Sequence, residues 1–204
     1  MNSLFFKEEH KMIKEMVKDF AITKIAPVAR ELDSKEIFPK ELVTEMGELG
    51  LMGVMVPEKY GGSELDMTAF TTAIIELAKA DASVAITMAA HNSLGIMPLL
   101  LFGSEEQKKS YLPQLASGNT LGAFGLTEPD AGSDAGSTKT KAIRSGDEYI
   151  VNGGKIFITN AGEAGFLSFT AQVIEDENSL GIGCLLYTSP SPRDRTRSRM
   201  PSSA

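Results

Sequence analysis

The residues best suited to chemistry lie in the stretch GAFGLTEPDAGSDAGSTKTKA at 122–142. It combines several glycines with the hydroxyls of Thr127 and Ser133 and with an acidic turn, EPD, at 128–130. Glycine-rich loops expose backbone N–H groups that can face a phosphate oxygen, and each hydroxyl adds one more donor. The stretch therefore predicts a site for an anionic cofactor, although the same composition is also typical of a surface turn.

Two common nucleotide-binding patterns do not fit this stretch. A P-loop needs glycine five residues after Gly132, where Ser137 stands, and it leaves Lys139 out of place. No G-x-G-x-x-G pattern opens a helix, which excludes the usual dinucleotide fingerprint. Neither an NTPase nor a Rossmann site is supported.

The elements before this stretch are predicted to be helical. Apolar residues recur at spacings of three and four from Ser3 to about Leu32, which indicates an amphipathic helix interrupted at Pro27. Asp66, Asp81 and Ser104 are N-cap candidates for later helices. The further helices are expected over 39–49, 66–79, from 81 or 83 to 92, and from 104 until Pro113 ends or restarts the last one.

After Gly118 the apolar period changes from 3.6 to 2, which indicates strands. We expect strands over 121–127, 139–144, 148–151, 155–159 and 166–173. The predicted fold class is α+β, with an N-terminal all-α helical domain at 1–120 followed by an incomplete antiparallel β domain at 121–184.

Composition limits the compartment and the partners. The net charge is −7, which argues against a nucleic-acid partner, and the single Cys184 excludes an internal disulfide. The N-terminus does not look like a signal peptide, and the longest apolar run, 95–102, contains Pro98 and is too short for a bilayer. We expect a cytoplasmic protein without membrane insertion.

The last twenty residues differ in amino-acid composition from the rest of the chain. Residues 185–204 hold four Arg and no Lys, whereas residues 1–184 hold 14 Lys and two Arg. Ser and Pro dominate the end of the chain and no apolar period continues there. We predict that 185–204 is disordered, and we interpret it as a foreign or out-of-frame translation.

The string GLTEPDAGSDAGS at 125–137 resembles the signature of the acyl-CoA dehydrogenases. The resemblance covers roughly residues 4–184 and is strongest with the short-chain, butyryl-type members. It also rests on PEKYGG at 57–62, NSLG at 92–95, FGSEEQKKSYLPQLASG at 102–118 and GDEYIVNGGKIFITNAG at 146–162.

The resemblance implies a flavoprotein oxidoreductase. Such an enzyme α,β-dehydrogenates a short-chain acyl-CoA, passes a hydride to FAD and then passes electrons to an electron-transfer flavoprotein, usually as a homotetramer. The family's catalytic base is a Glu in a C-terminal four-helix domain that has no match here, so no catalytic residue is predicted and the chain as written is expected to be inactive. Two alternatives are a non-catalytic fragment that binds acyl-CoA or a partner, and an acyl-CoA oxidase as the parent protein.

The resemblance also implies which residues contact the ligands. Thr127 and Thr159 would bond the flavin ring system, Phe157 would pack on it, and Ser133 would meet the FAD pyrophosphate and part of the acyl-CoA. Phe157 and Ile158 have an alternative role as the buried face of a strand, and Ile86 and Ala90 as helix core. The predicted cofactor residues are Phe124, Leu126, Thr127, Ser133, Phe157, Ile158 and Thr159; the predicted substrate residues are Ser133, Ile86, Thr87 and Ala90.

No metal site is predicted, and neither histidine resembles a catalytic residue of the family. His10 is expected on an exposed helix in contact with solvent. His91 is expected to be a hydrogen-bonding partner at a helix end.

Overall fold

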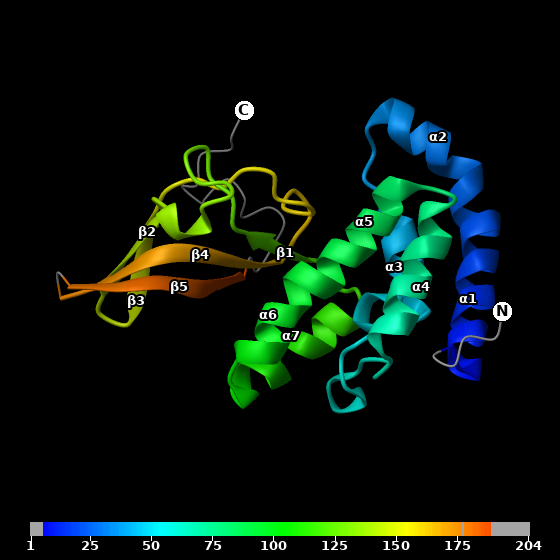
Figure 1. Cartoon of the computed structure of the whole chain (residues 1–204), viewed down its shortest axis with the longest axis horizontal. Helices are drawn as coiled ribbons and strands as arrows, with labels where there is room; N and C mark the ends of the chain where they lie inside the picture. Colours follow the sequence, from blue (N-terminus) through cyan, green and yellow to red (C-terminus); the bar gives the residue numbers. More distant parts are fainter. Residues whose placement is uncertain (1–5, 177, 189–204) are drawn as a thin grey trace. The chain divides into compact units, whose positions relative to one another are not determined.

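A computed structural model describes residues 6–176 and 178–188, and the chain divides into two compact units, Met1–Thr120 and Leu121–Ala204 (Figure 1). Each unit is described by itself. A helical unit followed by a strand unit confirms the predicted α+β class.

The first unit consists of helices, and three of them begin at the predicted caps. Asp66 accepts a hydrogen bond from the Ala69 amide (3.0 Å), Asp81 accepts one from Val84 (2.9 Å), and Ser104 forms a capping box with Gln107. Two 3₁₀ turns, η2 (Leu51–Gly53) and η3 (Glu58–Tyr60), follow α3. The helices are α1 (Glu8–Phe20), the π-helix η1 (Ala21–Ile25), α2 (Ala26–Lys35), α3 (Lys40–Glu48), α4 (Met67–Ala78), α5 (Ala82–Ala90), the π-helix η4 (His91–Ile96), α6 (Met97–Phe102) and α7 (Glu105–Ala116).

The two prolines that were predicted to interrupt helices behave differently. Pro27 lies in the first turn of α2, directly after η1, so the predicted interruption is confirmed. Pro113 lies inside α7, which continues to Ala116, so the predicted end or restart there is wrong. Pro113 is exposed, and the carbonyl that loses its amide donor can bond water instead.

Helices α5, η4 and α6 run together as one helix, Ala82–Phe102. Its length and apolar composition would allow it to cross a membrane, but 56% of its most apolar window is buried by the rest of the chain, as is usual for a core helix. Buried Asn92 ties the helix to its neighbours by accepting from the Val54 amide and donating to the Leu51 carbonyl. The sequence predicted a helix only as far as Asn92.

His91 is completely buried in η4, and its Nε2 lies 3.0 Å from the Leu115 carbonyl oxygen. Burial lowers the pKa of His91 to about 4, although the carbonyls of Leu115 and Met52 act in the opposite direction. The ring is therefore neutral in the folded protein near neutral pH, and His91 is the helix-end partner that was predicted.

The second unit is a five-stranded mixed sheet centred on β4 (Phe166–Glu175). Strand β5 (Asn178–Thr188) pairs antiparallel along the whole of β4. The other edge of β4 pairs in parallel first with β1 (Gly122–Gly125) and then with β2 (Lys141–Ser145). Strand β3 (Glu148–Asn152) forms an antiparallel hairpin with β2.

Three details of the predicted β domain need correction. The sheet is mixed rather than antiparallel, because β1 and β2 both run parallel to β4. The segment 155–159 is not a strand, because Phe157 has a positive φ of 57° that breaks extended backbone. Residues 185–188 are not a disordered tail, because they end β5 and pair with 166–169; residues 189–204 lie outside the described residues.

Acid is predicted to destabilise the first unit through His91. The unfolded chain takes up this proton near pH 6.5, whereas the folded chain takes it up only near pH 4. The contribution of neutral His91 is therefore complete above pH 6.5 and is lost as pH falls from 6.5 toward 4, by about 3 kcal/mol in all. Urea unfolding across this window should show a shallower pH dependence for His91→Gln than for the unsubstituted chain, and equal slopes would contradict the assignment.

Candidate functional site

A buried carboxylate, Glu128, lies near the start of the signature loop, residues 126–140, which connects β1 to β2. Only 4% of Glu128 is exposed, and its carboxylate accepts hydrogen bonds from the Thr138 hydroxyl, the Lys139 amide (2.6 Å) and the Thr140 amide (3.1 Å). These donors are ten to twelve residues further along the chain. Glu128 therefore closes residues 129–137 into a loop held at both ends.

Lys155 is the cation that faces this carboxylate. Its Nζ lies 2.7 Å from Oε1 of Glu128, and its side chain is only 9% exposed. The same ammonium donates to the Leu126 carbonyl (3.0 Å), the Thr138 hydroxyl (2.9 Å) and the Thr170 hydroxyl (3.1 Å). One side chain thus joins the start and the end of the signature loop to the central strand.

The protonation state of Glu128 follows from its surroundings. Burial alone would raise the pKa of this carboxyl, but the hydrogen bonds from Lys155, Thr138 and the Lys139 amide outweigh that effect and hold the pKa well below its usual range. Glu128 is therefore a fixed negative charge rather than a group that exchanges protons near neutral pH.

The sheet register leaves room for this arrangement. Strand β1 ends opposite Phe169 and β2 begins opposite Gln172, so only Thr170 and Ala171 separate their partners on β4. Residues 126–140 leave the sheet edge at this gap and return to it. Lys155 donates a hydrogen bond to Thr170 in the same gap. Gly125 leaves space for the Lys155 side chain, because a Cβ at position 125 would lie only 3.2 Å from Cγ of Lys155.

Two of the predicted cofactor segments meet at this point. The Ile156 amide donates to the Thr127 carbonyl (2.9 Å), next to the Lys155 bond to Leu126. Leu126 and Thr127 therefore lie beside the chain that leads into Phe157, Ile158 and Thr159. The structure brings these five predicted residues into one region of the second unit.

Phe157 is an unusual residue in this region. Its side chain is 88% exposed and its φ is 57°, and it is the only aromatic residue with a positive φ in the described ranges 6–176 and 178–188. A bulky residue in the left-handed region costs on the order of 1–3 kcal/mol, and residues strained in this way cluster at functional sites. Its alternative role as a buried strand residue is wrong, while Ile158 is half-buried.

The remaining predicted cofactor residues lie at the loop and at the sheet edge. Ser133 is exposed in the loop that Glu128 closes, and a Cβ built on neighbouring Gly132 would meet no atom within 4 Å. Phe124 is half-buried in β1, paired in register with Ser168. The buried Ser168 hydroxyl has no hydrogen-bond partner among the described residues, which leaves a polar atom for a ligand or a water to satisfy.

The predicted substrate residues other than Ser133 lie in the first unit. Ile86 is 56% exposed on α5, whereas Thr87 and Ala90 are buried. Thr87 lines an open groove of about 740 Å³ between the start of α5 and residues 29–39, but Ile86 and Ala90 do not. Of the three side chains, only that of Thr87 therefore lines this groove.

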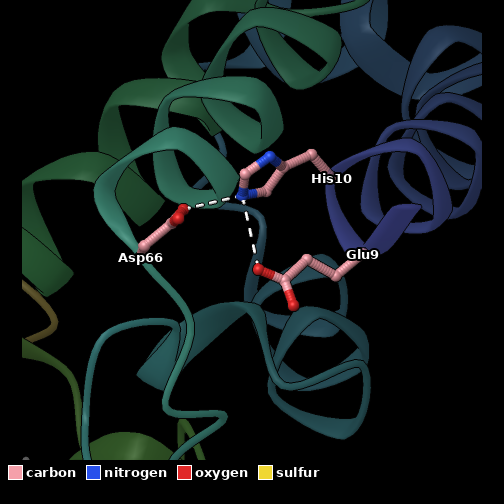
Figure 2. A group of neighbouring side chains, drawn as sticks. All are labelled: Glu9, His10 and Asp66. Carbon is pink, nitrogen blue, oxygen red and sulfur yellow. Dashed lines mark hydrogen bonds and ion pairs between the residues drawn. The ribbon is translucent and has the colours of Figure 1, made fainter. Parts of the chain in front are cut away.

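A second polar cluster, Glu9, His10 and Asp66, is a structural junction in the first unit (Figure 2). His10 is completely buried, so the prediction of a solvated ring is wrong. Its Nδ1 accepts from the Lys7 amide (3.0 Å), which leaves the ring proton on Nε2 to donate to Asp66 (2.9 Å). Both ring nitrogens are thus used in joining the N-terminus of α1 to the cap of α4.

Sequence reasoning assigned no role to Glu128, although it stands in the signature, and it missed Lys155 and Thr138. One feature of the sequence could have indicated the pair: Lys155 is a charged residue at the start of the apolar segment KIFIT, residues 155–159. A lysine at such a position is seldom buried unless it is paired.

Comparison with known proteins identifies the family. Residues 7–119 match the acyl-CoA dehydrogenase N-terminal domain, and residues 123–202 match the middle domain of the same enzymes. The chain belongs to the acyl-CoA dehydrogenase family. The middle-domain match includes most of the segment that the composition set apart at 185–204.

Individual relatives are similar over nearly the whole chain. An acyl-CoA dehydrogenase of Bacillus subtilis is 44% identical over 91% of this chain and 49% of its own length. The short-chain specific acyl-CoA dehydrogenase of Clostridium acetobutylicum is 39% identical over 87% of this chain and 47% of its own length. The chain therefore spans about half the length of the curated relatives it matches.

Solved structures agree with the fold. Butyryl-CoA dehydrogenase from Megasphaera elsdenii superposes with a TM-score of 0.85 at 40% identity, covering 93% of this chain and 51% of that one. An acyl-CoA dehydrogenase complexed with FAD from Bacillus anthracis gives 0.84 at 38% identity, covering 92% and 32%. A chain from work on the electron transferring flavoprotein of Acidaminococcus fermentans gives 0.87 at 41% identity, covering 93% and 50%.

Replacing Phe157 with a residue suited to positive φ is predicted to stabilise the ligand-free protein. Asparagine tolerates the left-handed region, so Phe157→Asn should raise the free energy of unfolding by about 1 kcal/mol. Thermal denaturation measures this gain. Phe102→Asn is the matched control, because Phe102 is 86% exposed in ordinary helical backbone at the end of α6. A Phe157→Asn variant no more stable than this control would contradict the strain.

Proposed function

We propose that this chain supplies the flavin-binding and acyl-CoA-binding half of a short-chain acyl-CoA dehydrogenase. The observation that carries the proposal is the exposed, strained Phe157 held beside Leu126 and Thr127 at the base of the signature loop. Membership of the family and the FAD complex of a relative support FAD as the cofactor.

The residues present suit a large cofactor with a flat ring and a diphosphate. The exposed Phe157 ring offers an apolar face to a flavin, and the hydroxyls of Thr127 and Thr159 offer donors beside it. Ser133 and the open backbone at Gly132 suit phosphate oxygens. Lys155 neutralises Glu128, so the carboxylate under the loop does not repel an anionic ligand.

Bound FAD supplies the hydride acceptor for oxidation of a CH–CH bond, and the protein supplies orientation and electrostatics. In our proposal this chain's residues bind and orient the ligands, with Ser133 contacting both the FAD pyrophosphate and the acyl-CoA. We propose that the general base comes from the part of the relatives' length that this chain does not span.

We further propose that the substrate is a short-chain acyl-CoA and that the electron acceptor is an electron-transfer flavoprotein. The similarity to short-chain and butyryl-CoA dehydrogenases supports the substrate, and the Acidaminococcus fermentans neighbour supports the acceptor. A cytoplasmic homotetramer is part of the same proposal.

Flavin retention and turnover test this function separately. The purified chain should retain FAD through dialysis, seen in its visible absorption spectrum, and should reduce no dye with butyryl-CoA by itself. Dye reduction would show that the chain needs no external base. Oxygen consumption with butyryl-CoA would favour the acyl-CoA oxidase alternative, and loss of all FAD on dialysis would contradict the flavin assignment.

Removing the Ser133 hydroxyl is predicted to weaken FAD binding without affecting the fold. A hydrogen bond to a charged group contributes about 1.5–3 kcal/mol, so Ser133→Ala should raise the FAD dissociation constant by roughly tenfold or more. Fluorescence titration with FAD measures the change. Ser145→Ala, an exposed serine at the end of β2, is the matched control and should bind like the unsubstituted chain. Equal affinity for both variants would remove Ser133 from the site.

A further inference from the structure

The site described above depends on two segments that are far apart in the sequence. One is the signature loop, closed by the Glu128 carboxylate. The other is the segment from Lys155 to Thr159, which carries the exposed Phe157. In the part of the chain that the structure describes, one backbone hydrogen bond joins them, from the Ile156 amide to the Thr127 carbonyl. All the other hydrogen bonds between the two segments in the described residues come from the Lys155 ammonium.

Glu128 and Lys155 are each occupied by the other and by neighbouring groups, so neither can contact a ligand directly. Both side chains are more than nine-tenths buried, and their mutual distance is 2.7 Å. Every group around Glu128 is a donor, and every group around Lys155 is an acceptor. Such a matched pair specifies one arrangement of the surrounding chain, because any other arrangement leaves a buried charge without its partner.

Stability alone does not explain why a buried ion pair occupies this position. A buried ion pair often contributes little net stability compared with apolar side chains of the same volume. Here it lies at the gap that β1 and β2 leave on the edge of β4, where Lys155 bonds Thr170, and its two members belong to the two segments that carry the predicted cofactor residues.

We propose that Glu128 and Lys155 are a positioning pair that couples the signature loop to the Phe157 segment and holds both in their ligand-ready arrangement before FAD binds. This inference rests on the proposed function for the identity of the ligand, but the coupling itself is a property of the ligand-free chain. Glu128 and Lys155 act through Ser133, Thr127 and Phe157 and do not themselves contact the ligand.

Amide hydrogen exchange in the ligand-free chain tests the coupling directly. Lys155→Met removes the charge with little change in volume and touches neither of the loop amides that bond Glu128. The Thr140 amide, which bonds Glu128, should nevertheless exchange about tenfold faster or more in this variant. Conversely, Glu128→Gln places an amide NH₂ among donors and should accelerate exchange at the Ile156 amide, which bonds Thr127 and not Glu128.

A matched control separates this coupling from general destabilisation. Glu76 on α4 is also buried, with 3% exposed, and pairs with Lys79 at 2.7 Å in the first unit. Glu76→Gln should leave exchange at Thr140 and Ile156 unchanged. If either pair variant does not fold, Thr138→Val replaces it, because that change removes only the hydroxyl that bonds both Glu128 and Lys155.

Titration with FAD then links the coupling to the ligand. Both pair variants should bind FAD about tenfold more weakly or worse, and the double variant should be no weaker than the weaker single one, because the two residues act as a unit. Glu76→Gln should bind normally.

The outcomes distinguish the inference from the proposed function. Exchange effects confined to the mutated segment, or pair variants that bind FAD like the unsubstituted chain, would overturn the positioning role and leave the flavin assignment intact. Reciprocal exchange effects in a chain that holds no FAD would support the coupling and overturn the proposed function.

Discussion

The second unit is organised around the need to satisfy one buried carboxylate. A charge such as that of Glu128 is tolerated inside a protein only when donors surround it, and here they come from the far end of a long loop and from Lys155. Meeting this requirement determines the path of the loop and of the segment after Gly153. The glycines nearby reflect the same constraint: Gly153 has a φ of 152°, and a Cβ there would lie 2.4 Å from the Thr140 hydroxyl oxygen.

The sheet provides the frame for this arrangement. One edge of β4 is fully occupied by β5, so β1 and β2 must share the other edge in succession, and the signature loop is an excursion between two strands that are nearly continuous along that edge. A loop anchored in this way can project exposed glycines and Ser133 while hydrogen bonds to Glu128 join its two ends. This combination of a fixed base and an open tip suits binding of a large ligand.

The helical unit uses polar groups for a different purpose. His10, His91 and Asn92 are buried, Asp66 is exposed, and each connects helix ends or turns that are distant in sequence. These side chains satisfy backbone groups that helices leave unpaired at their ends and at π turns. They connect elements of the helical unit, whereas the buried pair of the second unit joins the signature loop to the segment that begins at Lys155.

The sequence alone determined the fold class, the helix starts and the family, because caps, apolar periods and the 125–137 string are local signals that each residue carries with it. It could not determine that β1 and β2 share one edge of β4, that 155–159 is not a strand, or that residues 185–188 complete β5, because strand pairing depends on partners far away in the chain. The burial of His10 and the pairing of Glu128 with Lys155 were decided at the same level. A charged or titratable side chain is buried only where other segments supply its partners, and only the tertiary structure brings those segments together.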